Sequence, residues 1–163
     1  MDHLFTPWRM KYVQNEQKPE GCIFCCLPKE SDESALIVHR GQFAYVILNR
    51  FPYSSGHLMV VPFEHQASLE LLPEATRHEI MELVTRSLVV MGKVYRPNGF
   101  NVGGNIGAAA GAGVAEHIHL HVLPRWTGDT NFMSTIGETR ILPEELITSW
   151  TRLRAEWQQS FPD

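Results

Sequence analysis

Three histidines recur at every second position of the segment His117-Ile118-His119-Leu120-His121-Val122-Leu123, and this alternation constrains the fold more than any other feature of the chain. A β-strand directs successive side chains to opposite faces, so we expect the imidazoles on one face and the aliphatic side chains between them on the other. The aliphatic face can pack on a core, whereas burying three imidazoles costs free energy unless each ring has a partner. The segment therefore predicts a strand, running to about Pro124, that carries a functional row of imidazoles.

Apolar patterning predicts further strands before and after a long helix. The runs 35–39 and 43–49 flank Arg40-Gly41-Gln42 and are typical of a hairpin, and the runs 57–63 and 100–105 are typical of strands. Between Pro73 and Tyr95 the apolar spacing changes to i, i+3, i+4, which indicates an amphipathic helix.

A second amphipathic helix is expected over residues 140–160, with Pro143 and Glu144 in its first turn. Together these elements predict an α+β fold, an antiparallel β-sheet of about five strands with a central helix and a C-terminal helix. We expect residues 1–163 to form a single domain in which residues 1–34 are an N-terminal segment.

Composition and charge exclude some kinds of partner. The chain has 163 residues, and 14 basic against 18 acidic side chains give a formal net charge of −4. This charge argues against an extended nucleic-acid groove, but it is compatible with a small phosphate-bearing ligand. No apolar run approaches the roughly 20 residues of a membrane-spanning helix, and the N-terminus lacks the apolar region of a signal peptide. We expect a cytoplasmic protein without nucleic-acid or membrane partners.

The row of imidazoles has the chemistry needed to attack phosphorus. Imidazole is a nucleophile and a proton carrier near neutral pH, and in its neutral form it is also a metal ligand. Attack on phosphorus needs a neutral histidine as nucleophile, donors that spread the charge on the phosphoryl oxygens, and a route for protonating the leaving group. Immediately upstream, residues 105–113 (NIGAAAGAG) are nearly all small, so backbone N–H groups there can approach an anion closely. The two segments together predict a phosphate site.

The segment resembles the motif of the histidine-triad (HIT) family, His-φ-His-φ-His-φ-φ with φ apolar, at all seven positions. The similarity extends to residues 48–50 (LNR), 56–62 (GHLMVVP) and 105–113, and it covers roughly residues 5–160. The ending HVLPRW, followed by GDTNFM and a C-terminal helix, resembles the branch of diadenosine tetraphosphate phosphorylases and related bacterial proteins. The resemblance implies a HIT-like fold, a nucleotide substrate and a homodimer.

Roles for individual residues follow from this resemblance. His119, the middle histidine, is implied to be the nucleophile that attacks the α-phosphorus of a nucleotide and forms a covalent nucleotidyl-histidine. His121 and His57 correspond to catalytic histidines that donate to non-bridging phosphate oxygens. The implied nucleotide- and phosphate-binding residues are Asn49, Asn105, Gly111, Ala112, Gly113 and His121.

One departure from the family pattern concerns the acceptor of the nucleotide. Four residues before the first histidine of the triad, hydrolases of the family usually carry a polar side chain, often Gln, whereas this chain has Gly113. A side chain that would orient water is missing there, and a pocket of small residues has room for a phosphate ion. The difference favours phosphorolysis, with inorganic phosphate as second substrate, over hydrolysis.

Cys22-x-x-Cys25 has the spacing of two ligands in a structural zinc site, but the chain contains no second such pair. The other ligands would have to be histidines, and His65 and His117 are available. Zinc-bearing members of the family use this combination of ligands, with the first histidine of the triad as the fourth. The resemblance therefore implies a structural zinc ion at these four residues; the alternative is a pair of reduced cysteines in a partly buried loop.

Several other interpretations remain open from the sequence. The protein can instead be a hydrolase of dinucleoside polyphosphates or of nucleoside phosphoramidates, because the same attack by histidine serves both. It can be a weakly catalytic nucleotide-binding module, or a metal-binding protein that uses the row of histidines itself as ligands. The row can also be a solvated, histidine-rich strand face.

Overall fold

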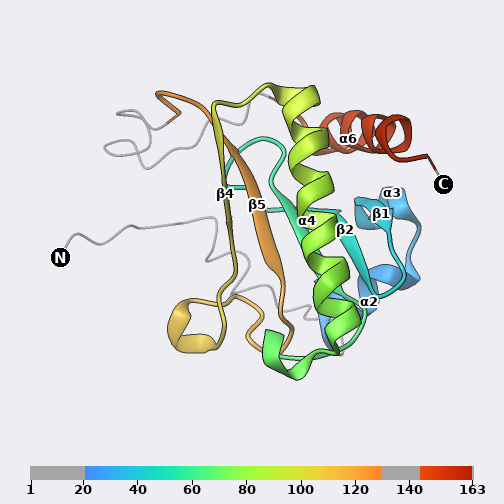
Figure 1. The fold of residues 1–163 in the computed structure, drawn as a ribbon, viewed down its shortest axis with the longest axis vertical. Helices are drawn as coiled ribbons and strands as arrows, with labels where there is room; N and C mark the ends of the chain where they lie inside the picture. The colour runs from blue at the N-terminus through green and yellow to red at the C-terminus, as the bar shows by residue number, and fades with distance from the viewer. Residues whose placement is uncertain (1–20, 130–143, 163) are drawn as a thin grey trace.

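A computed structural model describes residues 21–129 and 144–162, and within these ranges a five-stranded antiparallel sheet is covered on one face by helices α4 and α6 (Figure 1). The strands are β1 (Ile37–Arg40), β2 (Ala44–Leu48), β3 (Leu58–Pro62), β4 (Gly99–Gly103) and β5 (Leu120–Arg125). They pair in the order β1-β2-β3-β5-β4, so β5 is inserted between β3 and β4 while β1 and β4 form the edges. The predicted α+β arrangement with five antiparallel strands is confirmed.

The long helix α4 (Glu74–Tyr95) has the predicted bounds, with Pro73 at its N-cap. The N-terminal part of the described chain holds two helices that the sequence analysis did not predict, α2 (Ile23–Cys26) and α3 (Asp32–Ala35). Each is only four residues long, which is too short to show an apolar period. In the described ranges no helix is both long enough and apolar enough to cross a bilayer.

The sheet separates two apolar clusters. The larger one joins inward-facing strand residues such as Val46, Val60 and Leu120 to α4 and α6. The smaller one lies on the opposite face, where Phe24 of α2 packs with residues such as Tyr45 of β2. Because α2 is short, this second face leaves room for other side chains, and the histidine row lies there.

The strand that carries the triad is shorter than predicted, and the assignment of His117, Ile118 and His119 to it is wrong. Pairing with β3 begins at Leu120, opposite Val60, because in this register the next residues would face the end of β3 at Pro62, which has no N–H to continue the ladder. The N–H of Ile118 donates instead to the carbonyl of Gln66 at 2.7 Å.

The predicted alternation of side chains nevertheless continues through these extended residues. Ile118 is buried in the larger cluster with Leu120, whereas the rings of His117 and His119 contact Phe24 on the opposite face. The two faces of the segment therefore separate aliphatic from imidazole side chains, as expected.

The C-terminal helix α6 (Leu146–Ser160) begins later than predicted. Residues 140–143, including Pro143, lie outside the described ranges, and Glu144 precedes the helix. The Glu144 carboxylate accepts hydrogen bonds from the Ser149 hydroxyl at 2.6 Å and from the Tyr95 hydroxyl at 3.1 Å, so it fastens the start of α6 to the end of α4 instead of extending the helix. The predicted apolar face is confirmed, since Leu153 and Trp157 are buried.

One carboxylate fastens α4 to the turn between β1 and β2. Glu79 accepts hydrogen bonds from the backbone N–H groups of Gln42, Phe43 and Ala44, at 2.8, 2.5 and 2.8 Å. A Cβ atom at Gly41 would lie 2.7 Å from the same carboxylate, so the turn has no room for a side chain at that position.

Candidate active site

Three imidazoles meet where the start of β3 lies beside β5. His57 immediately precedes β3 and is fully buried, His119 immediately precedes β5 and is 6% exposed, and His121 lies within β5. The ring centroids of His119 and His121 are 4.9 Å apart, as are those of His57 and His121. The three histidines that the sequence analysis implied as catalytic therefore form one cluster.

His119 is held so that one particular ring nitrogen is nucleophilic. Its Nδ1 lies 2.9 Å from the carbonyl oxygen of His117, and because a carbonyl can only accept, the Nδ1 proton donates to it. The lone pair of the neutral ring is therefore on Nε2. Burial lowers the pKa of His119, against the opposing effect of this hydrogen bond, so the ring is neutral at neutral pH.

His121 is also neutral at neutral pH. Burial, with a smaller contribution from His119, lowers the pKa of His121 from 6.5 to about 4. Its Nδ1 lies 2.8 Å from Nε2 of His57. Within the described parts of the chain its Nε2 has no hydrogen-bond partner, so this atom is the one that can meet a ligand.

Asn49 and Tyr53 surround the other side of His57. The backbone N–H of Tyr53 lies 3.1 Å from His57 Nδ1, and the side-chain Nδ2 of Asn49 lies 3.3 Å from the same nitrogen. The Tyr53 ring packs against the rings of both His57 and His121, with centroids 4.8 and 6.0 Å apart. Asn49 was implied as a nucleotide-binding residue, and the structure places its side chain against the ring of His57.

The small-residue loop begins against the backbone of the candidate nucleophile. A Cβ atom at Gly104 would lie 2.9 Å from the carbonyl oxygen of His119 and 2.8 Å from a methyl group of Leu120. Further along, the Asn105 side-chain amide donates to the carbonyl of Gly111 at 3.4 Å, around a single turn of 3-10 helix (Ala108–Ala110).

The remaining members of the predicted phosphate site follow that turn. Gly111 and Gly113 are exposed and Ala112 is half-buried. Gly111 has a φ of +83°, a backbone conformation that side chains other than glycine's disfavour. The loop thus meets the histidine cluster at Gly104, and the residues expected to bind phosphate lie at its far end.

A second cluster consists of Cys22, Cys25, His65 and His117, whose ligand atoms all lie within 4.8 Å of one another. Nδ1 of His117 is 3.3 Å from Cys22 Sγ and 3.5 Å from Cys25 Sγ, and Nδ1 of His65 is 3.3 Å from Cys25 Sγ. In a tetrahedral site with ordinary Zn–S and Zn–N bond lengths, sulfur and nitrogen ligands lie about 3.6 Å apart. The four side chains therefore fit a tetrahedral metal ion.

The surroundings of this cluster also suit a metal. Nε2–H of His117 donates to the carbonyl of Pro62 at 2.9 Å, which leaves the Nδ1 lone pair directed at the two cysteines. Burial and the neighbouring Cys22 raise the pKa of the Cys25 thiol, so a thiolate at Cys25 needs a compensating cation nearby. The Tyr45 hydroxyl donates to the carbonyl of Phe24 at 2.8 Å and holds the short helix between the cysteines.

Phe24 joins the two clusters, and the sequence analysis gave it no role. Its ring centroid lies 4.8 Å from that of His119 and 5.5 Å from that of His117. Its place between Cys22 and Cys25 is a signal that could have pointed to it, because His117 was implied in both the metal site and the triad. For Tyr53 the sequence offers no comparable signal.

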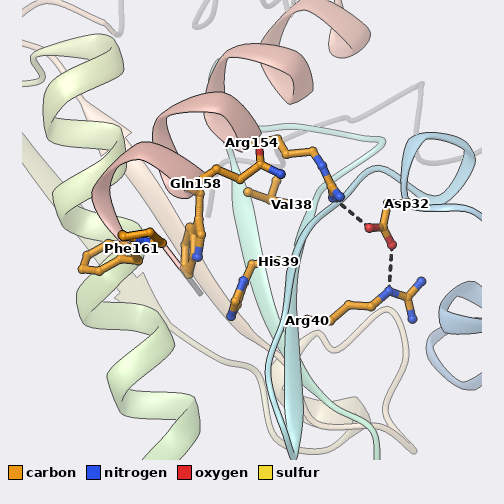
Figure 2. A pocket seen from close by; sticks show the side chains of 9 residues that line it. Asp32, Val38, His39, Arg40, Arg154, Gln158 and Phe161 are labelled. Carbon is orange, nitrogen blue, oxygen red and sulfur yellow. Dashed lines mark hydrogen bonds and ion pairs between the residues drawn. The ribbon is translucent and has the colours of Figure 1, made fainter.

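A cavity of about 460 Å³ lies away from the histidine cluster, between β1, α3 and α6 (Figure 2). Asp32 accepts hydrogen bonds from Arg40 at 2.7 Å and from Arg154 at 2.8 Å across its edge. Arg40 also donates to the carbonyls of Pro28 and Glu30, so its guanidinium is used within the fold. This region fastens α6 to the edge strand.

The chain is similar to known histidine-triad proteins in sequence and in structure. The HIT domain family matches residues 30–128. An AP-4-A phosphorylase of Mycobacterium tuberculosis is 40% identical over 165 residues, which cover 96% of this chain and 85% of that protein. An adenosine 5'-monophosphoramidase of Schizosaccharomyces pombe is 31% identical over 105 residues, which cover 64% of this chain and 74% of that protein.

A solved structure extends the similarity to the fold. A Zn-bound histidine triad family protein from Mycobacterium smegmatis superposes with a TM-score of 0.70 at 26% identity, over 86% of this chain and 95% of that one.

Proposed function

The chain belongs to the HIT family, and we propose that it is an enzyme of this family that cleaves dinucleoside polyphosphates, diadenosine tetraphosphate in particular, at the α-phosphate. The observation that carries the proposal is the neutral ring of His119, whose Nδ1 proton is held by the carbonyl of His117 so that its lone pair is on Nε2. The similarity over nearly the whole chain to a phosphorylase of this substrate class supports it.

The reaction has two steps. Nε2 of His119 attacks the α-phosphorus, an N–P bond forms, and the P–O bond to the β-phosphate breaks. The electron pair of that bond leaves with adenosine triphosphate, an anion whose charge the Nε2–H of His121 stabilises. A phosphate oxygen then attacks the nucleotidyl-histidine, the N–P bond breaks, and its electron pair returns to His119 as adenosine diphosphate is released.

The residues implied for binding keep those roles in the proposal. The backbone of Gly111, Ala112 and Gly113 holds the phosphates, with Asn105 fixing the loop. Asn49 lies against His57, where it contributes to the nucleotide pocket.

Phosphate rather than water is the acceptor. Gly113 has no side chain to orient water, which supports phosphorolysis together with the similarity to a phosphorylase. The test is incubation with diadenosine tetraphosphate with and without inorganic phosphate. Release of adenosine diphosphate and triphosphate only when phosphate is present is expected, whereas equal turnover in its absence makes the enzyme a hydrolase.

The nucleophile is tested in the same assay. His119→Ala is expected to lose turnover by several orders of magnitude while its melting temperature stays close to that of the wild type. Near-normal turnover, or an adduct mapped to another side chain, would refute the assignment.

A second candidate is hydrolysis of a nucleoside phosphoramidate, which uses the same attack with an amine as leaving group. The similarity to the Schizosaccharomyces pombe monophosphoramidase favours it as the alternative. Release of adenosine monophosphate from a phosphoramidate, with diadenosine tetraphosphate untouched, would select this function.

Cys22, Cys25, His65 and His117 would hold a structural zinc ion. Four protein ligands of this kind would stabilise the fold by linking the N-terminal segment to the residues before β5. Thiolate ligands require reducing conditions, which favours a cytoplasmic protein. About one equivalent of zinc by elemental analysis is expected, and a stable preparation without metal would contradict the assignment.

The 163 residues form a single domain that assembles as a homodimer. The edge strand β4, with Val102 exposed, offers unpaired backbone groups to a second copy. Light scattering coupled to gel filtration measures the mass directly, and a monomer at micromolar concentration would contradict this.

A further inference from the structure

Both ring nitrogens of His57 are engaged by protein atoms, which, among the residues that the structure describes, distinguishes it from His119 and His121. The side chain is 0% exposed, its Nδ1 faces the Tyr53 N–H, and its Nε2 lies 2.8 Å from His121 Nδ1. We infer that His57 does not contact the substrate and is instead a positioning residue, which acts through His121 by fixing which nitrogen of that ring carries the proton. The inference deepens the proposed function and rests on it for its kinetic part.

The direction of the hydrogen bonds is fixed at the backbone. An N–H group can only donate, so His57 Nδ1 holds a lone pair toward Tyr53. Asn49 acts in the same direction, because its Oδ1 accepts the N–H of Phe51 at 2.9 Å and its amide nitrogen therefore faces His57 Nδ1.

The same direction carries through to His121. With Nδ1 of His57 accepting, the proton of its neutral ring is on Nε2, and the 2.8 Å contact is a donation to Nδ1 of His121. The proton of neutral His121 is then on Nε2, the atom that has no partner among the described residues.

This arrangement decides what His121 presents to an anion. As the Nε2–H tautomer it presents a donor, which stabilises charge on a phosphoryl or leaving oxygen, whereas the other tautomer would present a lone pair. Without His57, no described residue holds His121 Nδ1 as an acceptor, so both tautomers become accessible. In serine hydrolases, loss of the group that fixes the tautomer of a catalytic histidine lowers kcat by about 10⁴.

The first experiment reads the tautomers directly, by long-range ¹H–¹⁵N NMR of the imidazoles in the full, zinc-loaded chain without nucleotide. In the wild type we expect His57 and His121 both in the Nε2–H form. In His57→Leu the single tautomer of His121 is lost, and in His57→Gln, whose amide can donate to Nδ1, it is retained. A wild-type Nδ1–H form of His121, or an unchanged His121 in His57→Leu, would overturn the inference.

The second experiment is a double-mutant cycle with diadenosine tetraphosphate and phosphate. His57→Leu alone is expected to lower kcat at least tenfold with KM within about threefold, and to change kcat less than about twofold when His121→Ala is already present. Losses that multiply, or a KM raised as much as kcat falls, would mean that His57 touches the substrate and would overturn the inference.

Two controls keep the outcomes separable. Melting temperatures show whether the His57→Leu variant folds. If it does not, His57→Gln is compared with the wild type in both experiments instead, and we expect it to recover most of kcat. A wild-type enzyme inactive on diadenosine tetraphosphate would remove the proposed function, whereas the NMR result would still decide the role of His57.

Discussion

Gly104 is the position where the small-residue loop contacts the backbone of the proposed nucleophile, so a single methyl group there tests whether the loop controls the placement of His119. The added Cβ of Gly104→Ala would lie 2.9 Å from the His119 carbonyl oxygen and 2.8 Å from a methyl group of Leu120. The Leu120 side chain can rotate away, but the carbonyl is fixed in the backbone. Relief to an ordinary contact therefore needs a relative shift of about 0.5 Å between the loop and His119.

The magnitude of the effect follows from that shift. Overpacking of this kind costs about 1–3 kcal/mol, which lowers the melting temperature of a protein this size by about 2–12 °C. A misplacement of 1 Å at a reacting group costs about 100-fold in rate, so a shift of half that size is expected to lower kcat about tenfold.

The neighbouring glycine supplies a matched control. A Cβ atom at Gly103 meets nothing within 4 Å, so Gly103→Ala makes the same chemical change in open space. With saturating diadenosine tetraphosphate and phosphate, we expect Gly103→Ala to stay within about twofold of the wild-type kcat. Equal losses in Gly103→Ala and Gly104→Ala, or a Gly104→Ala variant of normal kcat and melting temperature, would refute the reasoning.

Three further perturbations have defined outcomes. Phe24→Leu removes the ring beside His119 and is expected to lower kcat about tenfold with zinc content unchanged. Phe63 packs on Tyr45 in the same apolar cluster, and its replacement in Phe63→Leu is expected to leave kcat unchanged. The pKa of His121 is about 4 in the folded protein and 6.5 ordinarily, so between these pH values the unfolded chain binds more protons than the folded one. Urea unfolding should therefore show the free energy of unfolding falling as the pH drops from 6.5 to 4. The fall should be less steep in His121→Asn, which lacks this titrating ring. Glu79→Gln replaces one of the two accepting carboxylate oxygens with an NH2 donor that faces backbone N–H groups. It should cost about 1–3 kcal/mol by the same measurement, whereas an unchanged midpoint would contradict the role of that carboxylate.

The elements that the sequence predicts well are those whose burial repeats with a regular period. Helix α4 was predictable because its apolar positions recur over five to six turns, and the alternation around His119 was predictable because the two faces of that segment differ in chemistry. The ends of elements were less predictable. The start of β5 depends on Pro62, a residue far away in sequence whose pairing position only the folded sheet defines.

The contacts within the site depend on tertiary packing. The motif indicates that His57, His119 and His121 act together, but which nitrogen of each ring carries the proton depends on a carbonyl or N–H that the fold brings into reach. The Tyr53 N–H is such a group, because any residue except proline would supply it and no side-chain pattern marks it.

His117 connects the two clusters with three different atoms. Its Nδ1 belongs to the metal-ligand set, its Nε2–H is held by Pro62, and its carbonyl oxygen accepts the Nδ1 proton of His119. Interactions that fix the His117 ring also restrain the backbone carbonyl of the same residue. That carbonyl determines which ring nitrogen of His119 carries the lone pair. A metal ion held by Cys22, Cys25, His65 and His117 would therefore affect reactivity although it lies outside the reacting atoms, because it would stabilise the carbonyl that holds the Nδ1 proton of His119.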